Sequence, residues 1–322
     1  MTDHRDHRVL VAGETLVDLL PARPGPLSAV ETFDRRPGGA PANVAVGLAR
    51  LGHAPLFWTR VGADPFGEFL ADTLAEEGIP ERFVERDSDA KTTLAFVTHD
   101  ASGDRTFSFY RDGTADTRLE PGTVPDATLA AVDRVVCGGV PLAAGRSREA
   151  TRDLLERARA AGSETWFDPN YRPELWRDDD FGAVAGDALA HVGVLKATTG
   201  ELRELGLTGE TPTELAEAAT ERGPHTVLVT LGGDGALAHA TADAPWGPAT
   251  VEHAGYDVDV VDTTGAGDAF LAGAIARATA GDCSLENILS YANAVAAVAT
   301  TATGAMAALP SHETVVGVQD SA

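Results

Sequence analysis

The stretch Val261-Asp262-Thr263-Thr264-Gly265-Ala266-Gly267-Asp268-Ala269-Phe270 decides the fold around it. Valines that alternate with aspartates from Val258 to Val261 predict a short strand before it, and apolar residues at helical spacing from Phe270 to Ala278 predict a helix after it. Gly265 and Gly267 therefore lie in a predicted strand-to-helix turn. Because they have no Cβ, a ligand can approach the backbone there, and the N–H groups of the helix start form an anion site.

The carboxylate of Asp268 stands in the same predicted anion site. Such a site attracts a phosphate whereas a carboxylate repels it, so the pair indicates a place where a phosphate meets a hydroxyl group that must lose its proton. The alternative without function is that an aspartate in a first helical turn complements the helix dipole. A dinucleotide-binding turn is disfavoured, because it requires a third glycine where Phe270 stands.

A second glycine-rich stretch, Gly38 to Asn43, lies near the N-terminus. Its Pro41 suits the first turn of a helix whose apolar stripe runs from Val44 to Leu51. Asn43 lies off that stripe, beside Gly47. Asparagine is a weak helix former, and an amide that both donates and accepts hydrogen bonds suits a polyol. Local bonding by an asparagine at a helix start is the alternative.

Together, Asp262 to Asp268 and Gly38 to Asn43 resemble the two signatures of the ribokinase-like, or pfkB, family of carbohydrate kinases, and the similarity extends from about Val9 to Pro310. The resemblance implies an α/β fold in which a mainly parallel sheet is flanked by helices and carries a small β-sheet lid, as a single domain over residues 1–322. It implies ATP-dependent phosphorylation of a small sugar. The implied catalytic set is Asp268 as base, with the amides of Gly265, Ala266 and Gly267 stabilising charge on the transferred phosphoryl group.

Strands alternate with helical stretches along most of the chain, which favours a mainly parallel sheet covered on both faces. Arg8 to Gly13 is the first predicted strand. The alternation that follows places Asp18 on the same face as Leu16 and Leu20. A carboxylate among leucines either faces water at a sheet edge or meets a polar ligand. The family resemblance favours the ligand, a set of sugar hydroxyl groups.

A predicted β-hairpin interrupts this α/β rhythm after a helix from Pro65 to Glu77. Thr92 to His99 and Arg105 to Arg111 alternate around Asp100 to Asp104. The two lid segments, about residues 15–37 and 92–117, resemble the family's lid, which closes over the sugar and excludes water, and two copies of the chain are expected to pair through it. Arg111 shares a face with Phe107 and Phe109, and either reaches the sugar or caps the sheet surface.

Polar clusters follow the remaining predicted strands. Asp168 to Arg172 follow Thr165–Phe167, Lys196 and Glu201 follow Val192–Leu195, and Thr230 to Gly235 follow Thr226–Val229. Because ligands in open α/β sheets bind beyond the carboxyl ends of the strands, these clusters and Asp262 to Asp268 predict one crevice.

ATP must be held without a P-loop, because neither lysine of the chain, Lys91 or Lys196, follows the required glycine. The resemblance implies a nucleotide site that includes Lys196, Glu201, Thr230, Gly232, Gly235 and Asn293. Mg²⁺ is expected through water on Glu201, although Thr198 departs from the asparagine usual in the family's Asn-x-x-Glu motif. Asp262 and Thr264 match a monovalent cation site, expected to hold K⁺.

The resemblance also implies a sugar site, with Asp18, Gly38, Gly39, Asn43, Arg111, Asp168, Asn170 and Arg172 as its residues. Gly38 to Asn43, Thr93 to Thr98 and Phe109 to Arg111 are most similar to fructokinases. Asp168 to Trp176 is also similar to 2-keto-3-deoxygluconate kinases, whose carboxylate substrate an arginine would serve. A non-catalytic sugar or nucleotide sensor on the same fold is the third reading.

The amino-acid composition narrows the possible partners and the expected location of the protein. With 49 acidic and 25 basic residues the net charge is −24, which makes nucleic acid an unfavourable partner. The polar segment Met1 to Arg8 and the absence of a long apolar run predict neither a signal peptide nor a transmembrane helix. Cys137 and Cys283 lack metal-like spacing and fit a reducing compartment. A cytoplasmic protein without membrane partners is expected.

The charge of −24 predicts adaptation to molar salt, the alternative being an ordinary acidic protein that favours arginine. Self-repulsion between the acidic groups weakens where the Debye length falls to about 3 Å, near 1 M salt. We therefore expect the melting temperature and the activity to rise with KCl toward molar concentration. Melting curves measured from low to molar KCl check this, and a flat response would contradict it. Replacing KCl by NaCl separates screening from the expected K⁺ site.

Overall fold

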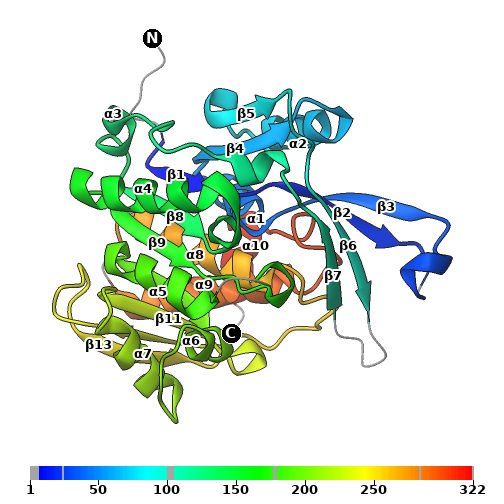
Figure 1. The fold of residues 1–322 in the computed structure, drawn as a ribbon. Helices are drawn as coiled ribbons and strands as arrows, with labels where there is room; N and C mark the ends of the chain where they lie inside the picture. Colours follow the sequence, from blue (N-terminus) through cyan, green and yellow to red (C-terminus); the bar gives the residue numbers. More distant parts are fainter. Residues whose placement is uncertain (1–6, 24, 100–104, 177–179, 283, 321–322) are drawn as a thin grey trace.

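Helices cover both faces of the larger sheet (Figure 1), and successive side chains of a strand point to opposite faces. In β1 (Val9–Ala12), Val9 and Val11 belong to one buried cluster, whereas Leu10 and Ala12 belong to another. The first cluster includes helices α1, α8, α9 and α10, and the second includes α4 to α7. An uninterrupted apolar strand is therefore what a doubly covered sheet requires.

The computed structural model describes residues 7–23, 25–99, 105–176, 180–282 and 284–320. Within them, the larger sheet has nine strands in the order β13-β12-β11-β10-β9-β8-β1-β4-β5, and β12 is the one strand that runs opposite to the other eight. Its strands are β13 (Ala249–His253), β12 (Ala236–Ala240), β11 (Thr226–Thr230), β10 (Val194–Thr198), β9 (Glu164–Asp168), β8 (Arg134–Gly138), β1, β4 (Leu56–Gly62) and β5 (Val84–Asp87). The predicted fold class is confirmed.

The helices of the described residues are α1 (Ala40–Arg50), α2 (Pro65–Glu76), α3 (Asp126–Leu129), α4 (Gly145–Ala161), α5 (Phe181–Ala188), α6 (Thr199–Glu204), α7 (Pro212–Thr220), α8 (Ala266–Thr279), α9 (Leu285–Ala299) and α10 (His312–Gln319). None of the helices in these ranges combines the length and the apolar character needed to cross a membrane.

A smaller sheet projects from the body (Figure 1). It has the order β3-β2-β6-β7, from β3 (Phe33–Gly38), β2 (Leu16–Pro21), β6 (Leu94–His99) and β7 (Arg105–Tyr110). The antiparallel pairing of β6 with β7 confirms the predicted hairpin, and its turn, residues 100–104, lies outside the described residues. Phe66 and Phe69 of α2 pack against the base of this sheet.

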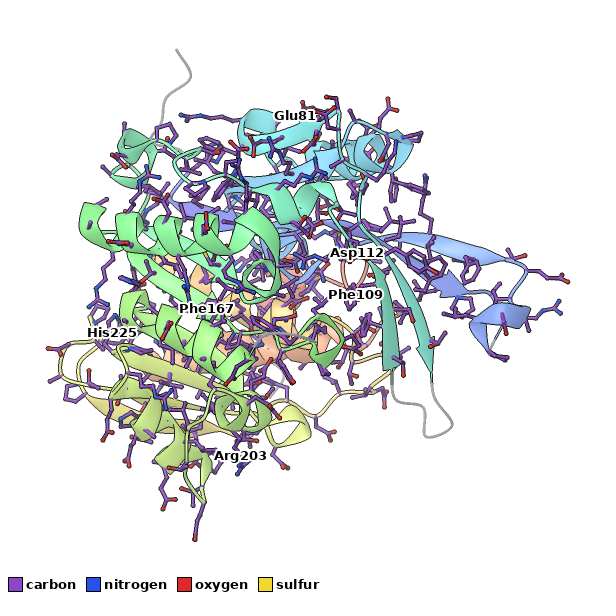
Figure 2. The ribbon with its side chains drawn as sticks, in the orientation of Figure 1. Glu81, Phe109, Asp112, Phe167, Arg203 and His225 are labelled. Carbon is purple, nitrogen blue, oxygen red and sulfur yellow. The ribbon has the colours of Figure 1, made fainter. Side chains whose placement is uncertain are left out.

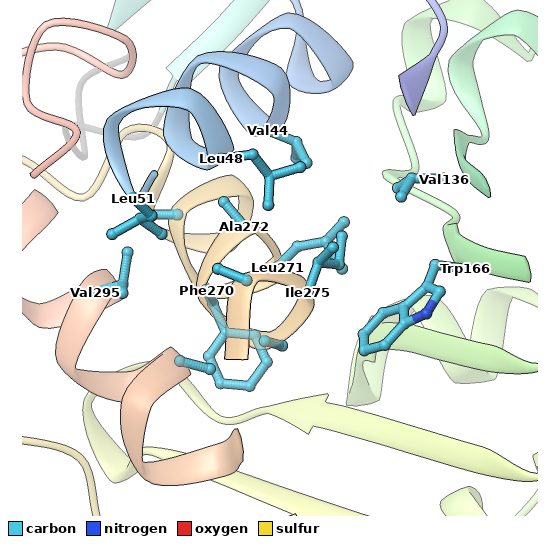
Figure 3. Packing of buried hydrophobic residues seen from close by; sticks show 14 of the residues in the cluster. Val44, Leu48, Leu51, Val136, Trp166, Phe270, Leu271, Ala272, Ile275 and Val295 are labelled. Carbon is cyan, nitrogen blue, oxygen red and sulfur yellow. The ribbon is translucent and has the colours of Figure 1, made fainter. Parts of the chain in front are cut away.

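Helix α1 packs closely on α8, and α8 packs on α9 (Figure 3). Two glycines make this possible. A Cβ on Gly47 would lie 2.8 Å from the Cβ of Ala272, and one on Gly273 would lie 2.9 Å from Cγ2 of Val295. The close approach fixes the start of α1 relative to the start of α8, which are the two ends that carry the predicted motifs.

The strand predicted over Val258 to Val261 is wrong. This segment is an irregular connection between β13 and α8, and Val260 and Val261 are 61% and 62% exposed. The amides of Val261 and Asp262 donate to the carbonyl of Thr300, at the end of α9, so their backbone bonds go to a helix end and not to a sheet edge. A second difference is smaller: Lys196 lies within β10 and not after it.

Asp64 joins the small sheet to the body. Its carboxylate accepts hydrogen bonds from the amides of Phe66 and Gly67, which caps α2, and from the amide and hydroxyl of Thr92, just before β6. Burial acts to raise the pKa of Asp64, but these bonds outweigh it and lower the pKa. Stability that depends on a lowered carboxyl pKa is present above the unfolded-state pKa and is lost as the pH falls through the folded-state value.

Asp64→Ala is therefore expected to lower the free energy of unfolding by about 1–2 kcal/mol near neutral pH, a typical loss for a helix cap with further bonds. Urea unfolding measures it, with the exposed Asp72→Ala on the same helix as control. The difference between wild type and variant should shrink at acid pH, where the wild-type carboxylate is protonated too. An equal loss of unfolding free energy in both variants would show that the hydrogen bonds of Asp64 make no specific contribution to stability.

Candidate active site

A cavity of 460 Å³ lies between the small sheet and the body. Its walls combine residues of both signature motifs with aromatic residues of β7 (Phe109 is labelled in Figure 2). It is lined by Glu14, Leu16, Asp18, Gly39, Ala40, Asn43, Phe107, Phe109, Val140, Asn170, Arg172, Thr263, Thr264, Gly265, Asp268 and Ala305. The volume suits a small molecule, and the mixture of carboxylates, amides and aromatic rings suits a polyol.

A buried hydrogen bond on the wall of this cavity joins the two signature motifs. Nδ2 of Asn43 donates to Oδ2 of Asp268 at 2.8 Å, across 225 residues of sequence. The amide oxygen of Asn43 is buried and has no hydrogen-bond partner among the described residues. Because buried polar atoms are nearly always paired, this oxygen indicates a ligand that donates a hydrogen bond.

Asp268 has an unusual acidity for an aspartate. Its burial raises the pKa to about 6, with Asp168 adding to the rise while Asn43, Lys196 and Arg172 oppose it. The carboxylate is therefore ionised at neutral pH yet basic enough to accept a proton. A poised value of this kind is typical of a general base.

The turn before Asp268 is held open by backbone geometry that favours glycine. Gly265 has φ 75° and caps α8, and a Cβ on it would lie 2.7 Å from Ala305. The amide of Ala266 donates to the carbonyl of Thr263 at 3.2 Å. The amides of Gly267 and Asp268 belong to the first turn of α8, where amide groups have no acceptor within the helix. The positive end of the helix dipole therefore lies at this turn.

Lys196 brings a positive charge to the same turn. A Cβ on Gly267 would lie 3.0 Å from Nζ of Lys196, so the glycine leaves space for the ammonium group. Lys196 is buried and donates to Oδ2 of Asp168 at 2.8 Å. Burial favours the neutral amine, but Asp168 and Glu201 outweigh it and raise the pKa of Lys196, which therefore stays charged.

Asp168 and Asn170 shape the adjoining wall. Oδ1 of Asp168 accepts the amide of Asn170 at 3.1 Å, and Asn170 has φ 43°, a left-handed conformation uncommon outside glycine. Such strain gathers at functional sites. The next residue but one, Arg172, lines the cavity and lies over the ring of Phe107, with its guanidinium carbon 5.6 Å from the ring centre.

Asp18 reaches the cavity from the small sheet. A Cβ on Gly38, the β3 residue that pairs with Leu16, would lie 2.1 Å from Oδ2 of Asp18, so Gly38 makes room for the carboxylate. Gly39 has φ 102° and packs on the backbone of Glu14. Steric contacts thus explain why both positions of the predicted motif are glycine.

Arg111 lies elsewhere. It forms a buried ion pair with Asp116, Nε to Oδ2 at 2.6 Å, and lines a neighbouring cavity of 700 Å³ with Phe107, Phe109 and Asp112. It is absent from the residues that line the 460 Å³ cavity. Phe107 and Phe109 lie between the two cavities.

The residues predicted to bind the nucleotide lie within β10, on α6, in and after the end of β11, and on α9. Thr230 ends β11, Gly232 has φ 64°, and Gly235 has φ 83° with no space for a Cβ beside the carbonyl of His253. Asn293 is buried on α9 and donates to the carbonyl of Leu289. Thr230, Gly232 and Gly235 thus belong to the turn after β11, and Asn293 belongs to α9.

Thr198, the departure from the family motif, has a structural role. Thr198 and Glu201 form a capping box at the start of α6, with each side chain bonded to the other residue's amide. Glu201 also accepts the amide of Tyr171 at 3.0 Å. Burial acts to raise the pKa of Glu201, but Lys196 and these bonds lower it, so the carboxylate is ionised.

Asp262 and Thr264 line a further cavity of 580 Å³, with Thr303 and Gly304. Asp262 accepts the amide of Thr264 at 2.9 Å and that of Gly304 at 2.8 Å, which joins the two loops. Carboxylate and hydroxyl oxygens suit a hard cation. No group of three or more His, Cys, Asp or Glu side chains suited to a metal ion occurs within the described ranges.

Glu14, Phe107 and Phe109 are among the cavity residues that the sequence analysis did not predict as site residues. Glu14 follows the end of β1, so the rule that ligands bind beyond strand ends applies to it as well. Phe107 and Phe109 belong to the small sheet, where alternation predicted their shared face but not the cavity beneath it.

Comparisons with known proteins agree with this geometry. The model of the pfkB family of carbohydrate kinases matches residues 6–312. The chain is 38% identical over 309 residues to the fructokinase of Klebsiella pneumoniae, covering 94% of this chain and 96% of that protein. A fructokinase of Xylella fastidiosa with bound ATP superposes with a TM-score of 0.85 at 31% identity, covering 98% and 99% of the two chains.

A double mutant of a Vibrio cholerae fructokinase, with fructose, ADP and a potassium ion bound, superposes with a TM-score of 0.83 at 30% identity, covering 98% of each chain. The family match spans nearly the whole sequence, and the buried Asn43–Asp268 pair joins both of its signatures. The chain belongs to the pfkB family of carbohydrate kinases and is an ATP-dependent sugar kinase.

Proposed function

We propose that the chain is a fructokinase, which transfers the γ-phosphoryl group of ATP to a hydroxyl group of fructose in the cytoplasm. The observation that carries the proposal is the Asn43–Asp268 pair, 2.8 Å apart on the wall of a cavity sized for a small sugar. The named fructokinases among its relatives support the choice of fructose. Asp18 and the unpartnered oxygen of Asn43 suit a substrate rich in hydroxyl groups.

In the proposed reaction, Asp268 accepts the proton of the sugar hydroxyl as its oxygen attacks the γ-phosphorus. The bond from that phosphorus to the bridging oxygen of ADP breaks, and ADP leaves. Asn43 holds one carboxylate oxygen and so fixes the direction of the other. The first amides of α8 and the ammonium group of Lys196 offset the charge on the transferred group.

The proposed cation sites follow the chemistry of their donors. Mg²⁺ neutralises the triphosphate when bound, and the ionised Glu201 would orient its water. Asp262 and Thr264, whose oxygens line one cavity wall, would hold K⁺ with nearby loop oxygens. Thr230, Gly232, Gly235 and Asn293 would contact the nucleotide. The small sheet is proposed as a lid and as the contact between two copies.

A second candidate substrate, 2-keto-3-deoxygluconate, is favoured by one observation. Arg172 lines the cavity and its guanidinium group lies over Phe107, beside the substrate space. A sugar acid would place its carboxylate against such a group. Arg111 is less suited, because Asp116 already pairs with it.

Asp268→Asn should fold and bind ATP yet lose kcat by about two orders of magnitude or more, the usual scale for a general base. Steady-state assays of ADP release measure the loss, and the exposed Asp257→Asn serves as a control with the same charge change. In wild type, kcat/KM should fall as the pH drops through about 6, because protonated Asp268 accepts no proton. Retention of more than a tenth of wild-type kcat would contradict the assignment.

The substrate is decided by kcat/KM for both sugars on wild type, Asp18→Ala, Arg111→Ala and Arg172→Ala. If fructose is the substrate, Asp18→Ala should lose at least about tenfold, and Arg172→Ala should lose less, since no sugar charge is left unpaired. If the keto acid is the substrate, Arg172→Ala should lose about a hundredfold or more, because a partly desolvated carboxylate remains. Wild-type preference for the keto acid would overturn the fructokinase proposal.

A further inference from the structure

Glu14 is a buried carboxyl group at the junction of the two sheets. It lies between the end of β1 and the start of β2, and its side chain is 3% exposed. Its Oε2 has no hydrogen-bond partner among the described residues. The proposed mechanism gives this group no task, although an unpaired buried carboxyl oxygen is costly to maintain.

The geometry directs Glu14 toward the substrate. It lines the 460 Å³ cavity together with Asn43 and Asp268. It also lines a much smaller cavity of 10 Å³, against Asp168 and Asn170, which is at the lower limit for one water molecule. Its backbone is fixed, because Gly39 packs on its carbonyl and the hydroxyl of Thr15 donates to the carbonyl of Gly38.

Burial disfavours the anionic form of Glu14 more strongly than the nearby arginines favour it. Burial raises the pKa of Glu14 to about 8 and Asp116 adds to the rise, while Arg111 and Arg172 oppose it. Besides the cationic Arg172, the titratable groups that line its two cavities are Asp18, Asp168, Asp268 and Cys137, of which three are carboxyl groups. A protonated Glu14 adds no charge to this cluster and presents an O–H donor.

A protonated Glu14 adds a hydrogen-bond donor to a cavity in which carboxylates are prominent. Sugar hydroxyl groups can donate to Asp18, Asp268 and the amide oxygen of Asn43, all of which accept. The ring or carbonyl oxygen of a sugar can only accept, so it requires a donor from the protein. Arg172 is one, and its Nη1 already donates to the carbonyl of Tyr171. Glu14 as an acid supplies another.

We propose that Glu14 is a substrate-binding residue, whose neutral carboxyl group donates a hydrogen bond to an oxygen of the acceptor sugar. The inference rests on the proposed function in placing the sugar in this cavity, and it holds for fructose or for another sugar. A glutamine at position 14 keeps a donor of nearly the same shape, whereas an alanine removes it. The two variants therefore separate donation from mere packing.

The test measures KM and kcat for Glu14→Gln, Glu14→Ala and wild type between about pH 7 and pH 9, a range that spans the folded-state pKa. A panel of hexoses, pentoses and 2-keto-3-deoxygluconate is assayed first, and the sugar that wild type phosphorylates best is used. At about pH 7 we expect KM within about threefold of wild type for the glutamine and about tenfold higher for the alanine, with kcat little changed. The exposed Glu76→Gln is the matched control.

The pH profile gives the readout that a structural role would not move. In wild type, KM should rise by up to about tenfold toward pH 9 as Glu14 loses its proton, whereas in Glu14→Gln it should stay flat. This comparison stands even if Glu14→Ala fails to fold. An equal rise in KM in both variants at neutral pH would overturn the proposal that Glu14 donates to the sugar. An unchanged KM in both variants would also overturn it and would assign Glu14 to the small internal cavity instead. A sugar other than fructose in the first assay would overturn only the choice of fructose.

Discussion

The hydrogen bond from Asn43 to Asp268 is the constraint on which the site depends. It joins the first turns of α1 and α8, which meet because Gly47 admits Ala272 at close range. A side chain at position 47 would separate the helices, and the carboxylate would lose its orientation even with every cavity residue intact. The two motifs that are far apart in the sequence are thus parts of one helix contact. The helix contact therefore requires a glycine at position 47, although glycine inside a helix is unfavourable for helix stability.

A chain with a net charge of −24 must bind a polyanion, and the structure places a buried cation beside the helix start that carries Asp268. Lys196, one of two lysines in the sequence, reaches the first turn of α8, where the helix dipole is also positive. Asp168 holds the ammonium group at 2.8 Å and keeps it charged despite its burial. The same burial raises the pKa of Asp268 to about 6, so a cation and a base coexist within one turn without neutralising each other.

The fold class, the small sheet and half of the residues that line the substrate cavity could be predicted from the sequence, because glycine motifs and strand-end clusters report local conformation directly. Prediction failed where the outcome depends on which partner a segment or side chain meets in the fold. The alternation in Val258 to Val261 has the period of a strand, but its amides meet the end of α9 and no strand lies beside it. Arg111 shares the aromatic face as predicted, yet Asp116, five residues later, draws it away from the substrate cavity. Division into domains stays a prediction.

Sugar recognition and the position of the small sheet are linked through the backbone. Strand β1 in the centre of the body continues into β2 of the small sheet after only Gly13, Glu14 and Thr15. That connection packs on Gly39, the residue before α1, so a shift of the small sheet acts at once on Glu14 and on the start of the helix that carries Asn43. Asp18 belongs to the small sheet, whereas Asp268 belongs to the body. A sugar that contacted both Asp18 and Asp268 would therefore link the small sheet to the body, and it would favour the relative position of the two sheets in which both contacts are made.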